Sequence, residues 1–213
     1  MKIIKPQRIN IDNLIEVNNL TEEVEENDLI ANKKIENFSK ENMELYHITF
    51  EQMILEGIEI TNSKLEKNTF TDVIFNNCNF SNTSFENSYF TRCEFNNCKM
   101  TGCNLVETRL YNISFMESNA NYINLSTASM ENVLFYNAWL RNSYFQENKL
   151  KNIYFEKTDL TQAQFFKTSL KDIDLSDCKI EGIAVSMEDI KGAIIDSFQA
   201  TDLLYLLGVK IKF

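Results

Sequence analysis

Every fifth residue of this chain is apolar from Leu45 to Val185, with no insertion or deletion that breaks the phase. The run contains 29 consecutive matches, and Ala120 is its one weak member. A helix repeats its apolar residues about every 3.6 positions and a strand about every 2, so a strict period of five fits neither element. Such a period indicates a solenoid, in which each short unit buries its side chain by stacking on its neighbours.

The residue two before each of these centres forms a second column of small or aliphatic side chains, such as Val73, Ile113 and Ala138. We expect this column to face inward and the other three positions to face water. Free cysteine in a packed core behaves as a small hydrophobic residue, so we expect buried thiols here rather than disulfides or metal ligands. The cysteines of this column are Cys78, Cys93, Cys98, Cys103 and Cys178.

The segments CNFSNTSFENSYFTRCEFNNCKMTGCNL and TDLTQAQFFKTSLKDIDL carry both columns. In these segments the chain resembles the pentapeptide repeat family, and the resemblance covers about two-thirds of the sequence. It implies an all-β solenoid: a right-handed quadrilateral parallel β-helix in which five residues make one side and twenty make one coil. The Asp or Asn that the family prefers just before the centre is present at Asn79, Asn104, Asn119, Asn124, Asp159 and Asp174.

The period is lost at both ends, which predicts three parts. We expect an irregular, acidic N-terminal cap over residues 1–44, the β-helix over 45–185, and a short C-terminal helical cap and dimerisation module over 186–213. Each bare end of a parallel solenoid would promote aggregation unless it is covered. Both ends of the rod therefore need caps.

In the C-terminal part, Ser197 is the predicted N-cap of a helix over 198–207 that Gly208 closes. This helix carries more apolar residues than one end of a rod needs, so we expect it to join two copies as a homodimer. The alternative is an end cap alone. The tail resembles the C-terminal module of quinolone-resistance pentapeptide repeat proteins, which dimerise in this way. The expected interface residues are Phe198, Leu203, Leu204, Leu206 and Leu207.

The sequence favours a binding protein over an enzyme. His47 is the single histidine, the glycines form no phosphate-binding loop, and no metal-binding motif is present, so we expect no catalytic residues, no metal and no cofactor. No apolar run approaches the length that spans a membrane, and the first ten residues lack an apolar signal region. We therefore expect a cytoplasmic protein that does not enter a membrane.

The net charge of −10 argues against direct binding of nucleic acid. Most of it lies at the N-terminus, since residues 1–69 carry −6, residues 70–185 carry −3 and residues 186–213 carry −1. Within the coil the charges segregate by side. One side exposes basic residues, namely Arg92, Arg109, Lys149, Lys151 and Lys171. Its neighbour exposes acids that we predict to bind a partner, namely Glu94, Glu117, Glu156, Asp174 and Asp177.

An acidic rod suggests imitation of DNA. Quinolone-resistance pentapeptide repeat proteins are dimeric rods that mimic B-DNA and protect the type II topoisomerases DNA gyrase and topoisomerase IV from drugs or toxins. Some members carry loops that interrupt the coil, and this chain, which has none between 45 and 185, resembles the loopless members. The first hypothesis is such a DNA mimic; the second is a scaffold or interaction protein with an unrelated partner. Exposed aromatic residues are a further candidate site: Tyr136, Trp139, Tyr144 and Tyr154.

Overall fold

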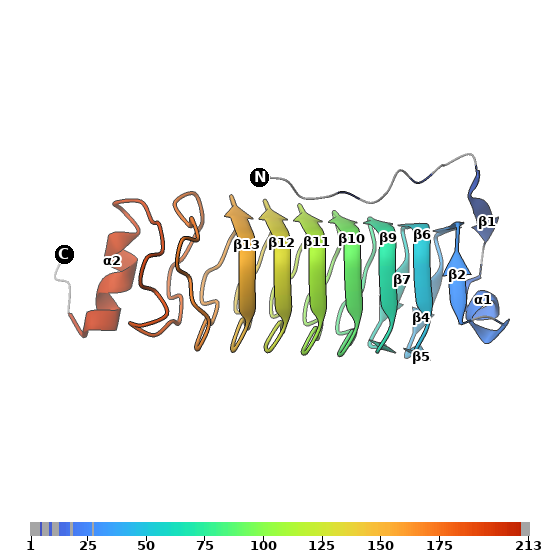
Figure 1. Cartoon of the computed structure of the whole chain (residues 1–213), viewed down its shortest axis with the longest axis horizontal. Helices are drawn as coiled ribbons and strands as arrows, with labels where there is room; N and C mark the ends of the chain where they lie inside the picture. The colour runs from blue at the N-terminus through green and yellow to red at the C-terminus, as the bar shows by residue number, and fades with distance from the viewer. Residues whose placement is uncertain (1–4, 6–8, 10–12, 18, 27, 210–213) are drawn as a thin grey trace.

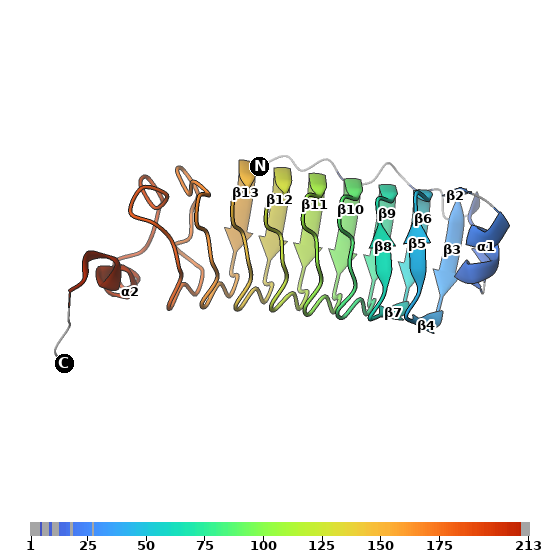
Figure 2. The same cartoon turned by 90° about the horizontal axis from the view of Figure 1, so that it is seen from below.

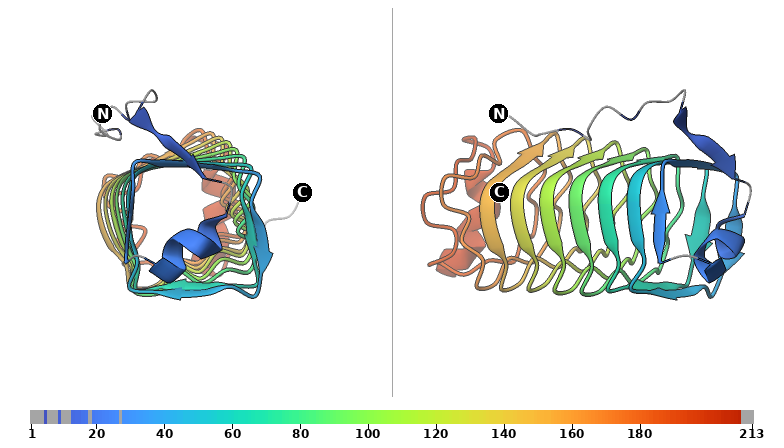
Figure 3. Two further views of the ribbon diagram at one scale, coloured as in Figure 1. Left: turned by 90° about the vertical axis from the view of Figure 1, so that its right-hand side faces the viewer. Right: turned by 45° about the vertical axis from the view of Figure 1, so that its right-hand side comes forward.

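The computed structural model describes residues 5, 9, 13–17, 19–26 and 28–209. Its strands wind into a parallel β-solenoid with a square cross-section, capped by helices at both ends (Figures 1 and 3). Each strand pairs with the strand about one coil further on, as in the pairing of Phe75 with Phe95 and of Phe95 with Phe115. The fold class expected from the period of five is confirmed.

Eight-residue strands form the main sheet. They are β6 (Thr49–Glu56), β9 (Thr69–Asn76), β10 (Tyr89–Asn96), β11 (Arg109–Met116), β12 (Ser129–Tyr136) and β13 (Lys149–Glu156). Shorter strands precede or lie between them: β1 (Ile15–Val17), β2 (Leu29–Ala31), β3 (Lys33–Glu36), β4 (Ser39–Glu41), β5 (Glu44–Tyr46), β7 (Glu59–Thr61) and β8 (Lys64–Glu66). The coils follow one another along a straight axis (Figure 2).

Four sides repeat every twenty residues, and we number them by their centres. The long strands form the first side, with centres such as Phe90 and Leu110, and the second side, with centres such as Phe95 and Phe115. Isolated bridges and turns form the third side, with centres such as Met100, and the fourth, with centres such as Leu105. Every long strand therefore bends around the corner between the first and second sides.

The inward columns make a continuous core. Phenylalanine rings stack from coil to coil, with centroids 4.5 Å apart for Phe75 and Phe95 and 4.8 Å apart for Phe115 and Phe135. This separation is close to the spacing of neighbouring strands, so the rings repeat with the backbone. The cysteines of the second column are buried free thiols, as expected.

The residue two after most centres turns the corner with a positive φ, as at Asn77 (54°) and Asn97 (52°). This left-handed region disfavours most side chains and suits Asn and Gly. Gly102 occupies such a corner, and a Cβ there would lie 2.5 Å from the side-chain oxygen of Asn82. The frequent Asn at this position is therefore a further sequence signal of the fold.

The parallel ladder begins earlier than Leu45. Strand β2 pairs with β6, and β4 pairs with β7. Part of the segment 1–44, which we expected to be irregular, therefore belongs to the regular turns of the solenoid. Ile30 and Ile35 continue the inward period, but Lys40 interrupts it and hid this start in the sequence. The helix α1 (Leu20–Glu26) lies across the open end of the square, where Leu20 is buried (Figure 3).

The ladder is broken on two sides after β13. In the earlier coils the first residue of each long strand donates to the preceding coil, as Lys149 N does to Ala128 O at 3.1 Å. No backbone hydrogen bond joins β13 to the described segment 169–177. The third and fourth sides continue past this point, where Leu160 N donates to Lys179 O at 2.7 Å.

Turns replace the strand in the segment 169–177. Ile173 N donates to Leu170 O at 3.1 Å, and Cys178 N donates to Leu175 O at 2.9 Å, which are the bonds of β-turns. Figure 1 shows the change as loops that follow β13. Leu150, the centre of β13 on the first side, is only partly buried next to these turns.

Candidate protein-interaction surface

The second side holds all five predicted acidic residues on its outer surface. Glu94, Glu156 and Asp174 are direct neighbours of an inward-facing centre, and such neighbours face outward. Glu117 lies at a corner with a φ of 52°. Asp174 and Asp177 are exposed, whereas Glu94 keeps only 17% of its side-chain surface. The sequence therefore placed these residues on one side correctly, but their exposure differs.

The acids of the N-terminal half of this side have partners. Glu36 pairs with Lys34, Glu56 accepts a hydrogen bond from Asn77 Nδ2 at 2.6 Å, and Glu94 lies 3.6 Å from Lys5 Nζ. Within the part of the chain that is described, Glu117 and Glu156 form no salt bridge. The uncompensated negative charge is thus in the C-terminal half.

Three of the predicted acids meet where the ladder is broken. Glu156 on β13 faces Asp174 and Asp177 across a cleft of about 370 Å³ that Tyr154 also lines. Hydrogen bonds from Ser176 lower the pKa of Asp174, so its carboxylate is charged at neutral pH. The cleft concentrates negative charge at the end of the acidic side.

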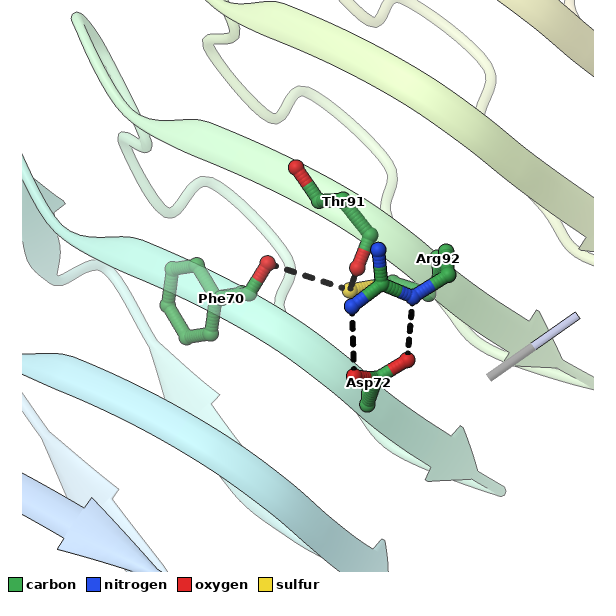
Figure 4. Close-up of polar contacts among 5 residues, drawn as sticks. Phe70, Asp72, Thr91 and Arg92 are labelled. Atoms are coloured by element: carbon green, nitrogen blue, oxygen red, sulfur yellow. Dashed lines mark hydrogen bonds and ion pairs between the residues drawn. The ribbon is translucent and has the colours of Figure 1, made fainter. Parts of the chain in front are cut away.

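The neighbouring first side is less basic than its sequence suggests. Arg92 donates two hydrogen bonds to Asp72, at 2.6 and 2.7 Å, and Asp72 is almost fully buried (Figure 4). The hydrogen bond to Asp72 raises the pKa of Arg92. Lys151 pairs with Glu131 at 2.7 Å, and the Arg109 guanidinium lies 5.2 Å from the centre of the Tyr89 ring. Of the five basic residues, Arg92 and Lys151 are thus paired, and Arg109, Lys149 and Lys171 form no salt bridge with a described residue.

Burial keeps the thiol beside this ion pair protonated. Cys93 Sγ contacts the carbonyl oxygens of Phe70 and Thr91 at 3.5 Å (Figure 4). Loss of solvation raises the pKa of Cys93 to about 12, and burial likewise raises that of Cys103 to about 12. Because the thiolate is the reactive form, these cysteines serve packing rather than chemistry.

An aromatic surface lies on the third and fourth sides, away from the acids. It consists of Tyr122, Trp139, Tyr144 and Phe166, which are 37 to 56% exposed. The charged residues among them are paired: Arg141 with Asp159, and Lys167 with Glu147. Of the aromatic residues singled out from the sequence, Trp139 and Tyr144 lie here, whereas Tyr136 and Tyr154 are partly buried on the second side.

The C-terminal helix is shorter than predicted. It comprises α2 (Ala200–Leu203) and the 3-10 turn η2 (Leu204–Leu207), and Gly208 ends it with a φ of 69°. Ser197 as N-cap is wrong. Asp196 Oδ1 instead accepts the backbone N–H of Gln199 at 3.0 Å, while Gln199 Oε1 accepts that of Asp196 at 2.8 Å. This reciprocal pair has the form of a capping box and closes the turn just before α2, whose own N-cap residue, Gln199, has no side-chain cap.

The same glutamine fastens the helix to the rod. Gln199 is 6% exposed, and its Nε2 donates to the carbonyl oxygens of Leu175 and Cys178, both at 2.7 Å. Sequence reasoning missed this residue because a polar side chain in a short helix gives no signal of its tertiary partners.

The predicted dimer residues divide into two groups. Leu203 and Leu206 pack against the core, whereas Phe198 is 85% exposed and Leu204 is partly exposed. The side chain of Leu207 lies outside the described residues. Two further exposed residues, Ile194 and Tyr205, lie at the same end and were not predicted.

The described residues contain no group of three His, Cys, Asp or Glu side chains placed to hold a metal ion. None of the described helices has the length and apolar character needed to cross a bilayer. His47, the single histidine, is an exposed corner residue with a φ of 62°.

Comparison with known proteins places the chain in a family. Two family descriptions match: "Pentapeptide repeats (9 copies)" over residues 50–109 and "Pentapeptide repeat region" over residues 88–165. Together they span more than half of the sequence. No curated protein sequence matches it.

Solved structures of low sequence identity resemble the fold. They include QnrB1, a plasmid-mediated fluoroquinolone resistance protein (20% identity, TM-score 0.38, 85% of this chain and 90% of that chain). HetL from Nostoc sp. strain PCC 7120 is involved in heterocyst differentiation regulation (12% identity, TM-score 0.41, 79% and 91%). A third is a thylakoid-lumen protein of Arabidopsis thaliana (18% identity, TM-score 0.21, 54% and 66%). On the evidence of its matched repeats and its four-sided coil, the chain belongs to the pentapeptide repeat family.

Proposed function

We propose that this protein is a non-enzymatic DNA mimic that binds DNA gyrase or topoisomerase IV in the cytoplasm and protects the enzyme from quinolones or toxins. The observation that carries the proposal is the acidic second side, whose unpaired carboxylates gather in its C-terminal half. The resemblance of the sequence to the loopless quinolone-resistance members suggests the partner.

The spacing of the acids supports imitation of a nucleic-acid strand. Neighbouring coils are about 4.8 Å apart, and one DNA strand presents a phosphate about every 3.4 Å. The second side carries five acids over the coils from Phe95 to Leu175, of which Glu94 is largely covered and lies beside Lys5, so its free charges are sparser than those of DNA. Complementary shape therefore has to contribute to binding alongside charge.

Dimerisation through the C-terminal end would double the length of this side. Phe198 is the strongest candidate contact, since an aromatic side chain that is 85% exposed loses much apolar surface when a partner covers it. A two-fold pairing of the two C-terminal ends produces a closed dimer with both rods pointing away from the interface.

The partner-binding prediction is tested with a gyrase supercoiling assay, with and without ciprofloxacin. We expect Glu117→Lys with Glu156→Lys to lower the effect of the protein on gyrase, because both carboxylates face outward and form no salt bridge with any described residue. The melting temperature should change little, since surface substitutions usually alter stability by about 0.5 kcal/mol. Binding should also weaken with salt, which screens exposed charges beyond about 8 Å.

The matched control reverses two exposed acids on other sides, Glu107→Lys with Glu181→Lys, and alters the net charge equally. If both double variants act alike, the second side is not the binding surface. If the wild-type protein neither inhibits gyrase nor relieves quinolone inhibition at large molar excess, the DNA-mimic proposal fails.

The dimer prediction is tested by light scattering. The intact protein should have about twice its mass of 24.9 kDa, and Phe198→Glu should give monomers with an unchanged circular dichroism spectrum. Phe198 tests the dimer interface better than Leu203, because Leu203 packs against the core and its substitution would also disturb folding. A monomeric wild type at micromolar concentration would refute the dimer.

The aromatic surface favours the second candidate, an interaction protein with an unrelated partner. Interface centres are enriched in Tyr, Trp and Phe, as this surface is, and its charged residues are paired with one another. If gyrase does not respond, Trp139→Ala with Tyr144→Ala becomes the informative variant in searches for another partner.

A further inference from the structure

Where the ladder is intact, the residue just before each centre joins its coil to the preceding one. On the third side Lys99 shows the pattern: its N–H donates to Cys78 O at 2.8 Å, and its carbonyl oxygen accepts the N–H of Phe80 at 2.7 Å. The first side follows the same register, since Lys149 N donates to Ala128 O at 3.1 Å. Each side thus presents one acceptor and one donor to the coil that follows.

Strand β13 presents the same groups to the coil after it, but there they stay open. By register, the acceptor and the donor of its second side are Ile153 O and Phe155 N, and the residue placed to bond both is Asp174. No hydrogen bond joins the Asp174 backbone to either group in the described structure. On the first side, Asn148 O likewise lacks the bond from Ser169 N. An unpaired strand edge of this kind is a template for pairing with another chain.

A cleft follows this open edge. Its two parts, of about 280 and 370 Å³, lie along the first and second sides of β13 and share Ile153, Tyr154 and Asp172 in their walls. The core behind the cleft is closed, since Phe155 and Leu175 are at most 2% exposed. A segment bound in the cleft can therefore turn only small side chains toward the core.

The walls of the cleft are acidic. Four carboxylates line it, and none of them forms a salt bridge with a described residue: Glu156, Asp172, Asp174 and Asp177. Lys171 is the one base among the described residues that line the two parts. Electrostatic complementarity therefore favours basic side chains on the outward face of a bound segment.

We propose that the cleft after β13 binds an extended peptide that alternates basic and small residues, added to the open edge as a parallel strand. One basic residue donates its N–H to Ile153 O and accepts the N–H of Phe155, in the pattern that Lys99 shows. The basic side chains face the acids of the second side, and the small ones face the closed core. The site does not rest on the proposed function, although the two share Glu156, Asp174 and Asp177.

The site is tested by fluorescence anisotropy of the labelled, end-blocked peptide Lys-Ala-Lys-Ala-Lys with the full-length protein. We expect saturable binding that Glu156→Gln with Asp177→Asn weakens about fivefold, because two exposed charge pairs are lost. The matched control, Glu107→Gln with Glu181→Gln, neutralises two exposed acids on other sides and should bind like the wild type. Equal weakening by the two double variants would overturn the cleft as the site.

Strand addition is tested on the backbone itself. The same peptide with N-methylated lysines keeps its charge but loses the N–H groups that would donate to Ile153 O, so we expect it not to bind. The unmodified peptide should slow hydrogen exchange of the Phe155 amide and leave that of Phe95, which lies in the intact ladder between β10 and β11, unchanged. Equal affinity of the methylated peptide, or unchanged exchange at Phe155, would overturn strand addition.

These measurements use no topoisomerase, so their outcome is separate from that of the supercoiling assay. If the peptide does not bind at large molar excess, the cleft proposal fails whatever gyrase does. If the peptide binds as expected and gyrase does not respond, the DNA-mimic proposal fails and the peptide site stands.

Discussion

The strand β13 and the segment 169–177 occupy the same two sides of the rod, one coil apart, yet only β13 is a strand. Both fill their inward positions, since Leu170 and Leu175 are as fully buried as Phe155. Burial of the centres therefore does not distinguish the two regions. The comparison indicates that the inward columns specify the coil, whereas outward residues decide whether a side forms a strand or a turn.

The residue just before the centre explains the difference. Several of the long strands carry residues there that favour extended backbone, such as Thr69, Ile74 and Tyr154, although β10 has Glu94 and β12 has Ser129. In the segment 169–177, Asp174 Oδ1 instead accepts the backbone N–H of Ser176 at 2.9 Å, and such local bonds compete with a ladder. Five residues of the third and fourth sides make the same bond at 3.1 to 3.3 Å: Asn79, Asn104, Asn119, Asn124 and Asp159.

The largest expected effect comes from a buried charge in each region. We expect Phe115→Asp to abolish soluble folded protein, because an unpaired buried carboxylate costs several kcal/mol against a total stability of about 5 to 15 kcal/mol. Leu175→Asp should disorder only the coils after β13, where two sides of the ladder are already open. Circular dichroism of the two variants measures the loss of strand structure, and hydrogen exchange shows whether β9 to β12 stay protected in Leu175→Asp.

Asn87→Asp, at a partly exposed corner, is the control and should fold normally. Global unfolding caused by Leu175→Asp would show that the coils after β13 do not unfold independently of β9 to β12. Equal tolerance of Asp at Phe115 and Asn87 would contradict the inward register itself.

A smaller effect is expected at the junction of the cap with the last coil. Gln199→Ala removes the donor to the carbonyl oxygens of Leu175 and Cys178, and a buried acceptor left unpaired costs about 1 to 3 kcal/mol. Hydrogen exchange should accelerate in residues 169–207 and remain unchanged in β9 to β12. Gln162→Ala, at an exposed corner, is the matched control, and equal effects of the two variants would exclude the anchoring role.

The smallest expected effect comes from a substitution that should extend the ladder from β13 into the segment 169–177. Asp174→Val removes the acceptor of the turn and adds a residue that favours strands, a preference worth up to about 1 kcal/mol. We expect slower exchange of the backbone amides of Leu150 and Phe155 as the ladder closes. Asp177→Val changes the charge equally without removing this hydrogen bond, so identical behaviour of the two variants would show that Asp174 does not keep the ladder open.

The period of five was sufficient to predict the coil, because each centre has to face inward for the repeat to bury any surface. The ends were less predictable. Lys40 hid the first coils, and the capping pair of Asp196 and Gln199 depends on contacts that a sequence does not display. The five acids were placed on one side by register alone, but the contact between Lys5 and Glu94 joins residues far apart in sequence and could not be foreseen.

The open ladder after β13 also defines the direction in which bending of the rod would break the fewest hydrogen bonds. Two adjacent sides lack backbone hydrogen bonds across this plane, while the third and fourth sides retain them, as between Leu160 and Lys179. If the rod bends at this plane, the intact sides would serve as the hinge, and the first and second sides would open there. In a dimer joined at its C-terminal ends, two such hinges would flank the interface, and the angle between the rods could adjust to the curvature of a bound surface without any loss of core packing in β6 to β13.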